Sequence, residues 1–474
     1  MAGIDAKFLY AETASAHMHT VKVVVADVSR LPGGFSFDEV AAVLGRQIRR
    51  LPPLRRRMVP VPLGLGHPYW VEDPAFDLAR HLVRRVAEPP GDLASLARTV
   101  AAIASTPLPR DRPLWELSVV EGLAGGRIAV VVKLHHAVAD GGAAVNLLQN
   151  IVAGIADEGE ADGAGGTPPD DGWRPERLPG GWWLVARSLA GHARRARRLP
   201  RLVVRSVRGL ADSERRRRSL PGPPPLPFQA PRTSLNVPLT PARTFAMATL
   251  DLEACRAVRR ATGVTLNDVF VAACGGALRR YLAGRGELPR RSLVASVPVA
   301  IDRDPHRLSG NRVDHLYVSL GTHLADPAAR LAHVHALAEA SKEVRRALGH
   351  ELMEERADLV VPPLYAAAVR AWTATRLARW VPPPLNLVCS NVPGPRERIT
   401  FGPVVVEGLY SVGPILEGIG VNITAWSHAG DLCVSVLGCP TSLPDPWALV
   451  DLVPGALAEL VAATSCAVPA SRAT

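Results

Sequence analysis

The sequence contains few cysteines, no long hydrophobic run and no export signal, and each absence narrows the class of protein. The six cysteines all lie in the second half of the chain and form no CxxC pair, which favours reduced thiols over disulfides or a zinc site. Apolar runs such as 128–132 are far shorter than the ~20 residues that cross a bilayer. The N-terminal stretch is interrupted by Asp5, Lys7 and Glu12, unlike a signal peptide. We therefore expect a cytoplasmic protein without a membrane-spanning segment.

Length and composition point to a folded protein of more than one unit. Hydrophobic residues make up 47% of the 474 residues and charged residues 21%, which is the composition of a soluble globular protein. A chain of this length exceeds one ordinary compact core, so we expect two domains that share an interface. Such an interface leaves room for a cleft.

The net charge of +11 is concentrated in one segment. Between Trp182 and Arg218 there are twelve arginines and two acidic residues, so this segment carries +10 of the total. A basic total of this size suggests nucleic-acid binding, but the rest of the chain is nearly neutral. We therefore expect no nucleic-acid partner.

The basic segment has the periodicity of an amphipathic helix. At about 100° per residue, Trp182 and Leu189 fall on one side and Arg187 and Arg194 on the other. Pro200 is expected to end this helix, and a second basic stretch repeats the pattern after it. The pattern is typical of a helix in a membrane interface, with arginines on anionic headgroups. It is equally typical of a linker helix packed on its own protein, and both interpretations stay open.

Two stretches of linker composition flank the basic segment. Residues 157–180 are rich in Asp, Glu, Gly and Pro, and residues 221–231 are rich in proline. They predict an N-terminal domain over 1–156, a linker region over 157–231 and a C-terminal domain over 232–474.

Within both predicted domains, short β-branched runs alternate with segments of helical periodicity, which predicts an α/β fold. One helix is expected over 142–153. Another is expected to run to Leu282 from Thr265 and the pair Asn267-Asp268, whose small polar side chains can cap its first turn. Strands are expected at 127–134, 293–299, 313–320, 385–390, 420–426 and 432–437.

The most informative segment is HHAVADGG, residues 135–142, between a predicted strand and a predicted helix. The neutral imidazole of His136 can take a proton from a hydroxyl near neutral pH, because its unperturbed pKa is ~6.5. Asp140 follows four residues later and can order the backbone that presents the ring. Gly141 and Gly142 permit a sharp turn or a close substrate. A further His, Cys or carboxylate at metal-binding spacing is lacking nearby, so no metal is expected.

Residues His135 to Gly141 resemble the HHxxxDG signature of coenzyme A-dependent acyltransferases, in particular the bacterial wax ester synthase/diacylglycerol acyltransferase family. Upstream, Pro113-Leu114-Trp115 is similar to that family's PLW motif, and downstream Asn267-Asp268 is similar to its ND motif. Further segments agree in order and span nearly the whole chain outside the linkers: DAKFLYAETASAHMH, APRTSLN, SVPVAIDR, GNRVDHLYVSL, SNVPGPRERITFGPVV and GIGVNITAWSHAG.

The resemblance implies two chloramphenicol-acetyltransferase-like α/β domains with the active-site channel between them. It implies that His136 is the proton acceptor, that Asp140 is mainly a structural organiser and that His135 supports the turn. Gly141 is then expected to lie against substrate.

The resemblance also implies substrate-binding positions outside the central motif. Pro113-Leu114-Trp115 is expected to shape the acyl or alcohol pocket, although a buried Trp is more often plain packing. Asn267-Asp268 matches a motif required for activity and also makes an ordinary helix cap, and both interpretations stand. Ser390 and Asn391 follow a strand near Gly394, where a backbone amide or the Asn side chain could stabilise an oxyanion.

The activity implied by the resemblance is transfer of a fatty acyl group from acyl-CoA, as co-substrate, to diacylglycerol or a long-chain alcohol, without a cofactor. Because such acceptors live in membranes, the segment 182–218 is expected to bring the enzyme to an anionic surface, at the inner face of the plasma membrane or on lipid droplets. Two alternatives remain: an acyltransferase for carrier-bound or other lipid alcohols, and a non-catalytic protein that binds anionic membranes or nucleic acid.

Overall fold

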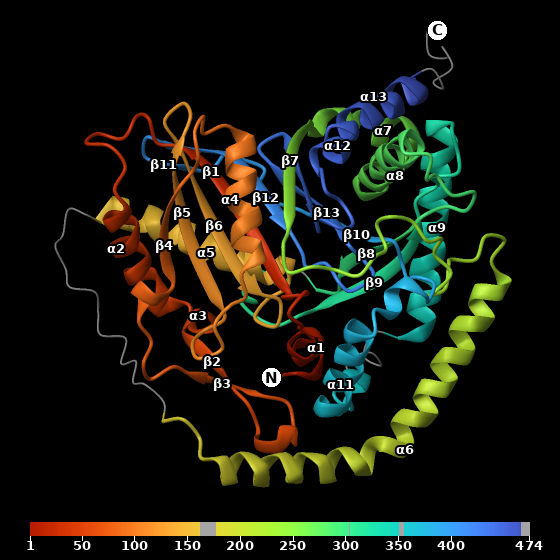
Figure 1. Ribbon diagram of the computed structural model, residues 1–474, viewed down its shortest axis with the longest axis horizontal. Helices are drawn as coiled ribbons and strands as arrows, with labels where there is room; N and C mark the ends of the chain where they lie inside the picture. Colours follow the sequence, from red (N-terminus) through yellow and green to blue (C-terminus); the bar gives the residue numbers. More distant parts are fainter. Residues whose placement is uncertain (162–176, 303, 350–354, 466–474) are drawn as a thin grey trace, which may run out of the picture.

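Two six-stranded sheets organise the chain, of which the computed structural model describes residues 1–161, 177–302, 304–349 and 355–465. The first sheet has the strand order β11-β12-β1-β6-β5-β4 and the second the order β7-β14-β13-β10-β8-β9. The sheets lie side by side with helices around them (Figure 1). The α/β fold expected from the sequence is confirmed.

The six strands predicted from the sequence are all present, with bounds that differ by at most about two residues, and the remaining strands were not predicted. The first sheet contains β1 (His19–Asp27), β4 (Leu82–Val86), β5 (Trp115–Leu123), β6 (Arg127–His135), β11 (Thr400–Phe401) and β12 (Val404–Val412). The second contains β7 (Thr244–Asp251), β8 (Val294–Ala300), β9 (Val313–Ser319), β10 (Leu387–Val392), β13 (Val421–His428) and β14 (Asp431–Gly438). A separate hairpin pairs β2 (Arg56–Val59) with β3 (Tyr69–Glu72).

The described helices cover the sheets and line their junction. They are α1 (Gly3–Ala11), α2 (Phe37–Gln47), α3 (Pro52–Arg55), α4 (Leu93–Ser105), α5 (Gly141–Ala161), α6 (Gly181–Ser219), α7 (Leu252–Thr262), α8 (Leu266–Gly284), α9 (Pro327–Leu348), α11 (Pro362–Ala374), α12 (Trp447–Val450) and α13 (Leu452–Ser465). Short 3₁₀ turns are η1 (Ile48–Arg50), η2 (Pro62–Gly64), η3 (Leu78–Arg80) and η4 (Leu377–Arg379).

The first sheet is completed by chain from the C-terminal part. Strand β12 pairs with β1 in antiparallel register, with Val23 opposite Tyr410, and β11 extends that edge. The boundaries predicted at 156 and 231 remain predictions. Residues 400–412, however, belong structurally to the sheet that carries the HHAVADGG segment, so the two parts of the chain are interlocked.

Helix α8 begins where the sequence predicts it. Thr265 Oγ1 accepts a hydrogen bond from the Asp268 amide (3.2 Å), and Asp268 Oδ2 accepts one from the Thr265 amide (3.0 Å). This reciprocal capping box satisfies two otherwise free amides. The helix then packs its apolar residues into the core of the second sheet, together with α13.

The prediction that Pro200 ends the basic helix is wrong. Helix α6 continues from Gly181 to Ser219 with Pro200 inside it. Proline removes one main-chain donor and clashes with the preceding turn, which bends a helix without necessarily terminating it. In Figure 1, α6 changes direction along its length as it runs beneath the two sheets.

Within the described residues, one helical stretch, Trp447–Ser465, is long and apolar enough to cross a membrane. Its residues Val453, Ala456 and Leu460 are fully buried in the core beside α8. Helices α7 and α8 pass the same test as a pair, but they meet at a bend of 108°. The apolar faces of these helices therefore pack into the core of the second sheet.

Candidate active site

The HHAVADGG segment forms the turn between β6 and α5. Strand β6 ends at His135, and the main-chain amide of His136 donates to the carbonyl of Met18 at the start of β1 (2.8 Å). The Val138 amide donates to the His135 carbonyl (2.9 Å), which tightens the turn before α5 begins at Gly141. His136 is thus presented at the junction of the two sheets.

Asp140 is the anchor of this turn. Its carboxylate is 1% exposed and accepts hydrogen bonds from the amides of Ala143 and Arg312, both at 2.8 Å. The Arg307 guanidinium donates to both carboxylate oxygens, at 3.1 and 3.0 Å. The described partners of Asp140 are main-chain amides and the Arg307 side chain. These contacts tie the start of α5 to the loop between β8 and β9. A mainly structural role for Asp140 stays a prediction.

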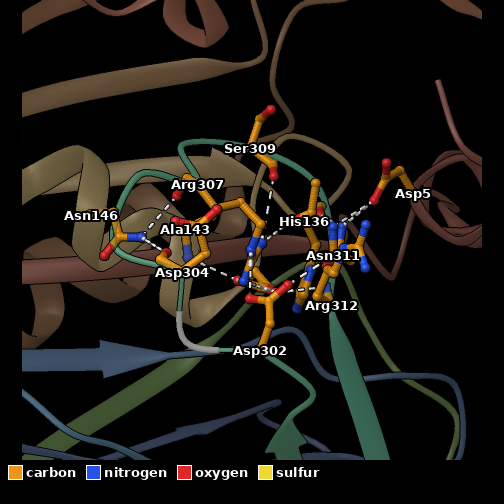
Figure 2. A network of polar contacts seen from close by, with 12 residues as sticks. Asp5, His136, Ala143, Asn146, Asp302, Asp304, Arg307, Ser309, Asn311 and Arg312 are labelled. Carbon is orange, nitrogen blue, oxygen red and sulfur yellow. Dashed lines mark hydrogen bonds and ion pairs between the residues drawn. The ribbon is translucent and has the colours of Figure 1, made fainter. Parts of the chain in front are cut away.

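A second contact from the same loop holds the main chain of His136. The side-chain amide of Asn311 donates to the His136 carbonyl (2.9 Å) and to Asp5 Oδ1 (2.8 Å). Asp5, on α1, also accepts the Asn311 main-chain amide (2.8 Å), and burial raises the pKa of Asp5. Figure 2 shows Asp5 and Asn311 converging beside His136. Three separate segments of the chain therefore set the backbone position of this histidine.

The loop between β8 and β9 also follows the turn along its length. The Gly310 amide donates to the Val138 carbonyl (2.9 Å), and the Asp140 amide donates to the Gly310 carbonyl (3.2 Å). Farther along, Asn146 Nδ2 donates to the carbonyls of Asp304 and Arg307 (3.0 and 2.9 Å). The loop between β8 and β9 thus holds the turn between β6 and α5, so residues from both parts of the chain build this candidate site.

The His136 imidazole is half-buried and lies against Phe8 of α1. The two rings stack with their centroids 4.1 Å apart and an interplanar angle of 12°. Nδ1 is buried without a hydrogen-bond partner among the described residues. Burial lowers the pKa of His136 to about 4, opposed by its own carbonyl and by Asp140, and assisted by Lys22 and Lys7. The ring is therefore neutral at physiological pH and able to accept a proton.

The rate of acyl transfer should depend on pH according to this lowered pKa. With a pKa of about 4, His136 becomes protonated only as the pH falls toward that value. We therefore expect kcat/KM to stay level from about pH 8 down to about pH 5.5 and then to fall as the base becomes charged. Measuring kcat/KM across this range checks the prediction, with circular dichroism at each pH to confirm that the fold persists. An acid limb centred near 6.5 would contradict the buried, neutral base.

His135 contacts the turn and Glu12, and its supporting role stays a prediction. Its Nδ1 accepts a hydrogen bond from the Ala137 amide (3.1 Å), which leaves the proton on Nε2, 3.2 Å from Glu12 Oε2. Arg110 also pairs with Glu12. Burial lowers the pKa of His135 well below its usual value, so the ring is neutral. It fixes the turn from the opposite face of β6.

A buried ammonium adds positive charge to the junction of the sheets. Lys22 of β1 is 3% exposed, donates to Ser411 Oγ (2.5 Å) and lies 5.7 Å from the centre of the Trp426 ring. Burial lowers the pKa of Lys22 to about 8. The charge of Lys22 contributes to the low pKa of His136.

The PLW segment lies directly beside the histidine pair. The Leu114 carbonyl accepts the His135 amide (3.0 Å), and the Trp115 indole donates to the Leu54 carbonyl (2.7 Å) while its ring stacks on His81. Leu114 and Trp115 are 1% and 3% exposed and belong to the core of the first sheet. Their contacts are those of packing and turn support, and a role for Pro113, Leu114 and Trp115 in shaping the substrate pocket stays a prediction.

The structure places Asn267-Asp268 at the capped start of α8. Besides the cap, Asp268 accepts a hydrogen bond from His335 Nδ1 of α9 (2.8 Å) and is 1% exposed. These contacts join helices on the outer face of the second sheet, and none of the described contacts links Asp268 to His136. The capping interpretation accounts for Asp268, and substrate binding by Asn267 or Asp268 stays a prediction.

Ser390 and Asn391 alternate across β10. Cys389 on this strand points into the helix-covered core, so Ser390 faces the opposite side, toward the first sheet. The Gly394 amide donates to Ser427 Oγ (3.0 Å). An oxyanion donor near Ser390 and Asn391, either a backbone amide or the Asn391 side chain, stays a prediction. Substrate contact by Ser390, Asn391 or Gly141 stays a prediction.

The residues that sequence reasoning missed are the partners of the motif. Arg307 bonds to Asp140, 167 residues away, and Asn311 bonds to the His136 carbonyl, 175 residues away. Asp5 in turn accepts from Asn311, 306 residues away. Two of them fall in segments quoted for the family resemblance, DAKFLYAETASAHMH and GNRVDHLYVSL, which was the only signal for them. A search of the described part of the chain finds no group of three metal-ligating side chains.

Comparisons with known proteins agree with this geometry. Residues 1–270 match the family model described as the wax ester synthase/diacylglycerol acyltransferase catalytic domain, and residues 309–461 match the WS/DGAT C-terminal domain. Two Mycobacterium tuberculosis proteins, provisionally named diacylglycerol O-acyltransferases, are similar over 97% of this chain. One is 38% identical with 95% of its own length covered, and the other is 36% identical with 90% covered.

Solved structures share the fold. The wax ester synthase/diacylglycerol acyltransferase from Marinobacter aquaeolei VT8 superposes with a TM-score of 0.63 at 26% identity, covering 98% of this chain and all of that one. The first condensation domain of the CDA synthetase has a TM-score of 0.58 at 17% identity, covering 98% of this chain and 95% of that domain, and so supports the fold alone. The chain belongs to the wax ester synthase/diacylglycerol acyltransferase family and is an O-acyltransferase.

Proposed function

We propose that the protein transfers a fatty acyl group from acyl-CoA to diacylglycerol, and that long-chain alcohols are a second class of acceptor. The observation that carries the proposal is the neutral, half-buried His136 imidazole, held at the junction of the two sheets by Met18 and Asn311. The names of the M. tuberculosis relatives support diacylglycerol as acceptor. Acyl-CoA enters as co-substrate, and the reaction needs no further group.

The chemistry follows from a single base. His136 takes the proton of the acceptor hydroxyl as its oxygen attacks the thioester carbonyl. The tetrahedral intermediate expels the CoA thiolate, and the imidazolium returns the proton to that sulfur. The products are an ester and free CoA, and His136 ends neutral. A low pKa makes the ring a weak base but a strong acid once protonated, which favours the second proton transfer.

The proposal includes docking on a membrane, because the acceptor is a lipid. The stripe expected to be apolar on α6 is not covered by the described protein: Trp182 is 87%, Leu189 54% and Val207 61% exposed. Leu63 of η2 is 86% and Leu364 of α11 69% exposed. Exposed apolar surface of this extent is typical of a membrane contact.

These exposed residues lie near one another and lead toward His136. Turn η2 touches both α6 and the start of α11, since a Cβ on Gly64 would lie 2.8 Å from Pro363. Helix α11 packs on α1, where Tyr365 and Tyr10 have ring centroids 6.4 Å apart. Helix α1 carries Phe8, which stacks on His136. We propose that lipid acceptors reach the site along this side, with the enzyme peripheral at the inner face of the plasma membrane or on lipid droplets.

The activity is tested by incubating the purified protein with palmitoyl-CoA and either dioleoylglycerol or hexadecanol. Free thiol and the ester product, identified by chromatography, are both measured. Triacylglycerol is the expected main product and wax ester the second. Failure to acylate either alcohol would contradict the proposal and turn attention to carrier-bound acceptors.

Vesicle binding tests the membrane contact. Wild-type protein is expected to cosediment with vesicles that contain phosphatidylglycerol and to be released by high salt, because the arginines of α6 can bind anionic headgroups while its exposed apolar residues enter the membrane interface. Truncating Trp182 and Leu189 to Ala together should weaken binding about 10-fold through lost apolar burial. Val86→Ala with Leu93→Ala removes exposed apolar surface from β4 and α4 and serves as the matched control. Equal losses in the two double variants would contradict a specific role for α6.

A further inference from the structure

A second histidine faces the site from the edge of the second sheet. His315 lies on β9, the outermost strand, between Asp314 and Leu316, which are 4% and 5% exposed. Leu316 enters the helix-covered core, so by strand alternation His315 points to the opposite face, where its side chain is exposed. That face is the one turned toward the first sheet.

His315 is held by a serine of the neighbouring strand. Ser296 of β8 is 4% exposed and its Oγ lies 3.0 Å from His315 Nδ1. The antiparallel pairing of β8 and β9 puts both residues on the same face, with His315 opposite Pro298 and Ser296 opposite Tyr317. With Nδ1 engaged, Nε2 is the ring nitrogen left for a ligand, because none of the described residues hydrogen-bonds to it.

His315 shares its surroundings with the catalytic base. The loop that leads to β9 passes through Asn311, whose side chain bonds to the His136 carbonyl, and His315 follows four residues later. Lys7 of α1 lowers the pKa of both His136 and His315, and His136 itself lowers that of His315. His315 therefore lies near His136, on the face of the second sheet that is turned toward the first.

The side chain of His315 is accessible, yet burial among protein atoms lowers the pKa of His315 to about 4, and the charge of Lys7 on α1 lowers it further. His315 is therefore a neutral hydrogen-bonding group at physiological pH.

We propose that His315, positioned by Ser296, hydrogen-bonds through Nε2 to an ester carbonyl of the diacylglycerol acceptor and so favours diacylglycerol over a long-chain alcohol. The inference rests on the proposed function and names the side chain that discriminates between diacylglycerol and a long-chain alcohol. Diacylglycerol carries two ester carbonyls beside its reactive hydroxyl. A long-chain alcohol has only the hydroxyl, which His136 engages. A single neutral donor next to the base can therefore distinguish the two.

The expected effect is one of specificity. A hydrogen bond between neutral groups contributes about 0.5–1.5 kcal/mol, or roughly 2- to 12-fold in kcat/KM. His315→Leu should lower kcat/KM for dioleoylglycerol by about that factor, mainly through KM, and leave hexadecanol unchanged or improved. His315→Gln retains an N–H donor and should recover part of the loss.

A matched control exists on the same strand. Ser319 of β9 and His333 of α9 form another Ser–His pair, with Ser319 Oγ 2.8 Å from His333 Nε2, and burial lowers the pKa of His333 as well. None of the described contacts links this pair to His136. His333→Leu should therefore change the two acceptors by the same factor.

The experiment is saturation kinetics of wild type, His315→Leu, His315→Gln and His333→Leu with each alcohol, followed by competition between equimolar alcohols. A fall in the ratio of triacylglycerol to wax ester with His315→Leu alone supports the assignment. An unchanged ratio, an equal loss with both alcohols or an acyl adduct on Ser296 would overturn it while acyl transfer stands. Wild-type protein that acylates neither alcohol would overturn the proposed function and this inference together.

Discussion

Replacing His136 by Ala is expected to lower kcat for acyl transfer by about 10³-fold, because general-base assistance contributes about 10²–10⁴-fold. The main chain at this position is held by Met18 and Asn311 and does not depend on the imidazole. Acyl-CoA binding should therefore be retained. The change is measured as thiol release at saturating palmitoyl-CoA, with isothermal titration for binding.

The fold of the His136→Ala variant should be unimpaired. The ring leaves a buried Nδ1 without a partner among the described residues, so its removal takes away an unsatisfied polar group along with the contact to Phe8. His136→Gln keeps a polar side chain that cannot act as a base at neutral pH, and should be as inactive as His136→Ala. Near wild-type turnover in either variant would show that His136 is not the general base.

Replacing Arg307 by Met should destabilise the protein and reduce turnover together. Asp140 would stay buried at 1% exposure with only the amides of Ala143 and Arg312 as partners. Breaking a buried ion pair costs about 3–5 kcal/mol. The midpoint of thermal unfolding should therefore fall by roughly 3–5 °C for a chain of this length. Turnover should fall because the catalytic turn loses its tie to the second sheet.

Two further variants separate this ion pair from general loss of charge. Arg312→Met removes an arginine whose side chain is 55% exposed and whose ion pair with Asp302 spans 3.5 Å, so stability should change by less than about 1 kcal/mol. Asp140→Asn combined with Arg307→Met removes the stranded charge and should recover part of the thermal midpoint. Equal destabilisation by Arg307→Met and Arg312→Met would contradict the anchoring role of Asp140.

The local features of the site could be predicted from sequence because they depend on neighbouring residues. The turn between β6 and α5 follows from a β-branched run, a glycine pair and a helical pattern in succession. The capped start of α8 follows from Thr265 and Asp268, three residues apart. Both rest on short-range rules of backbone geometry and hydrogen bonding, which hold largely independently of the rest of the fold.

The tertiary partners could not be predicted in the same way. Arg307 is one arginine among many, and only the path of the loop between β8 and β9 brings it to Asp140, 167 residues away. Likewise, β12 joins the first sheet through pairing with β1 that no local pattern specifies. The residues around His315 predict only an ordinary strand. Its place near His136 depends on how the two sheets meet.

The basic helix shows the limit of periodicity alone. The helical wheel separated the apolar stripe from the arginines of α6, but the stripe has the same sequence whether protein, membrane or solvent covers it. The structure leaves Trp182 and Leu189 exposed and turns Leu184 and Leu202 toward the protein. Pro200 was misjudged because a proline within a helix can bend it where surrounding contacts maintain both halves.

The central claim is direct transfer from acyl-CoA to the acceptor with His136 as the only base. It is tested most directly by a single-turnover experiment with enzyme in excess over labelled palmitoyl-CoA, quenched at intervals with and without dioleoylglycerol. Direct transfer predicts that CoA and labelled triacylglycerol appear with the same rate constant and that the protein carries no label. It also predicts that CoA release is slow without acceptor. Rapid CoA release without acceptor, accompanied by label bound to the protein, would contradict it.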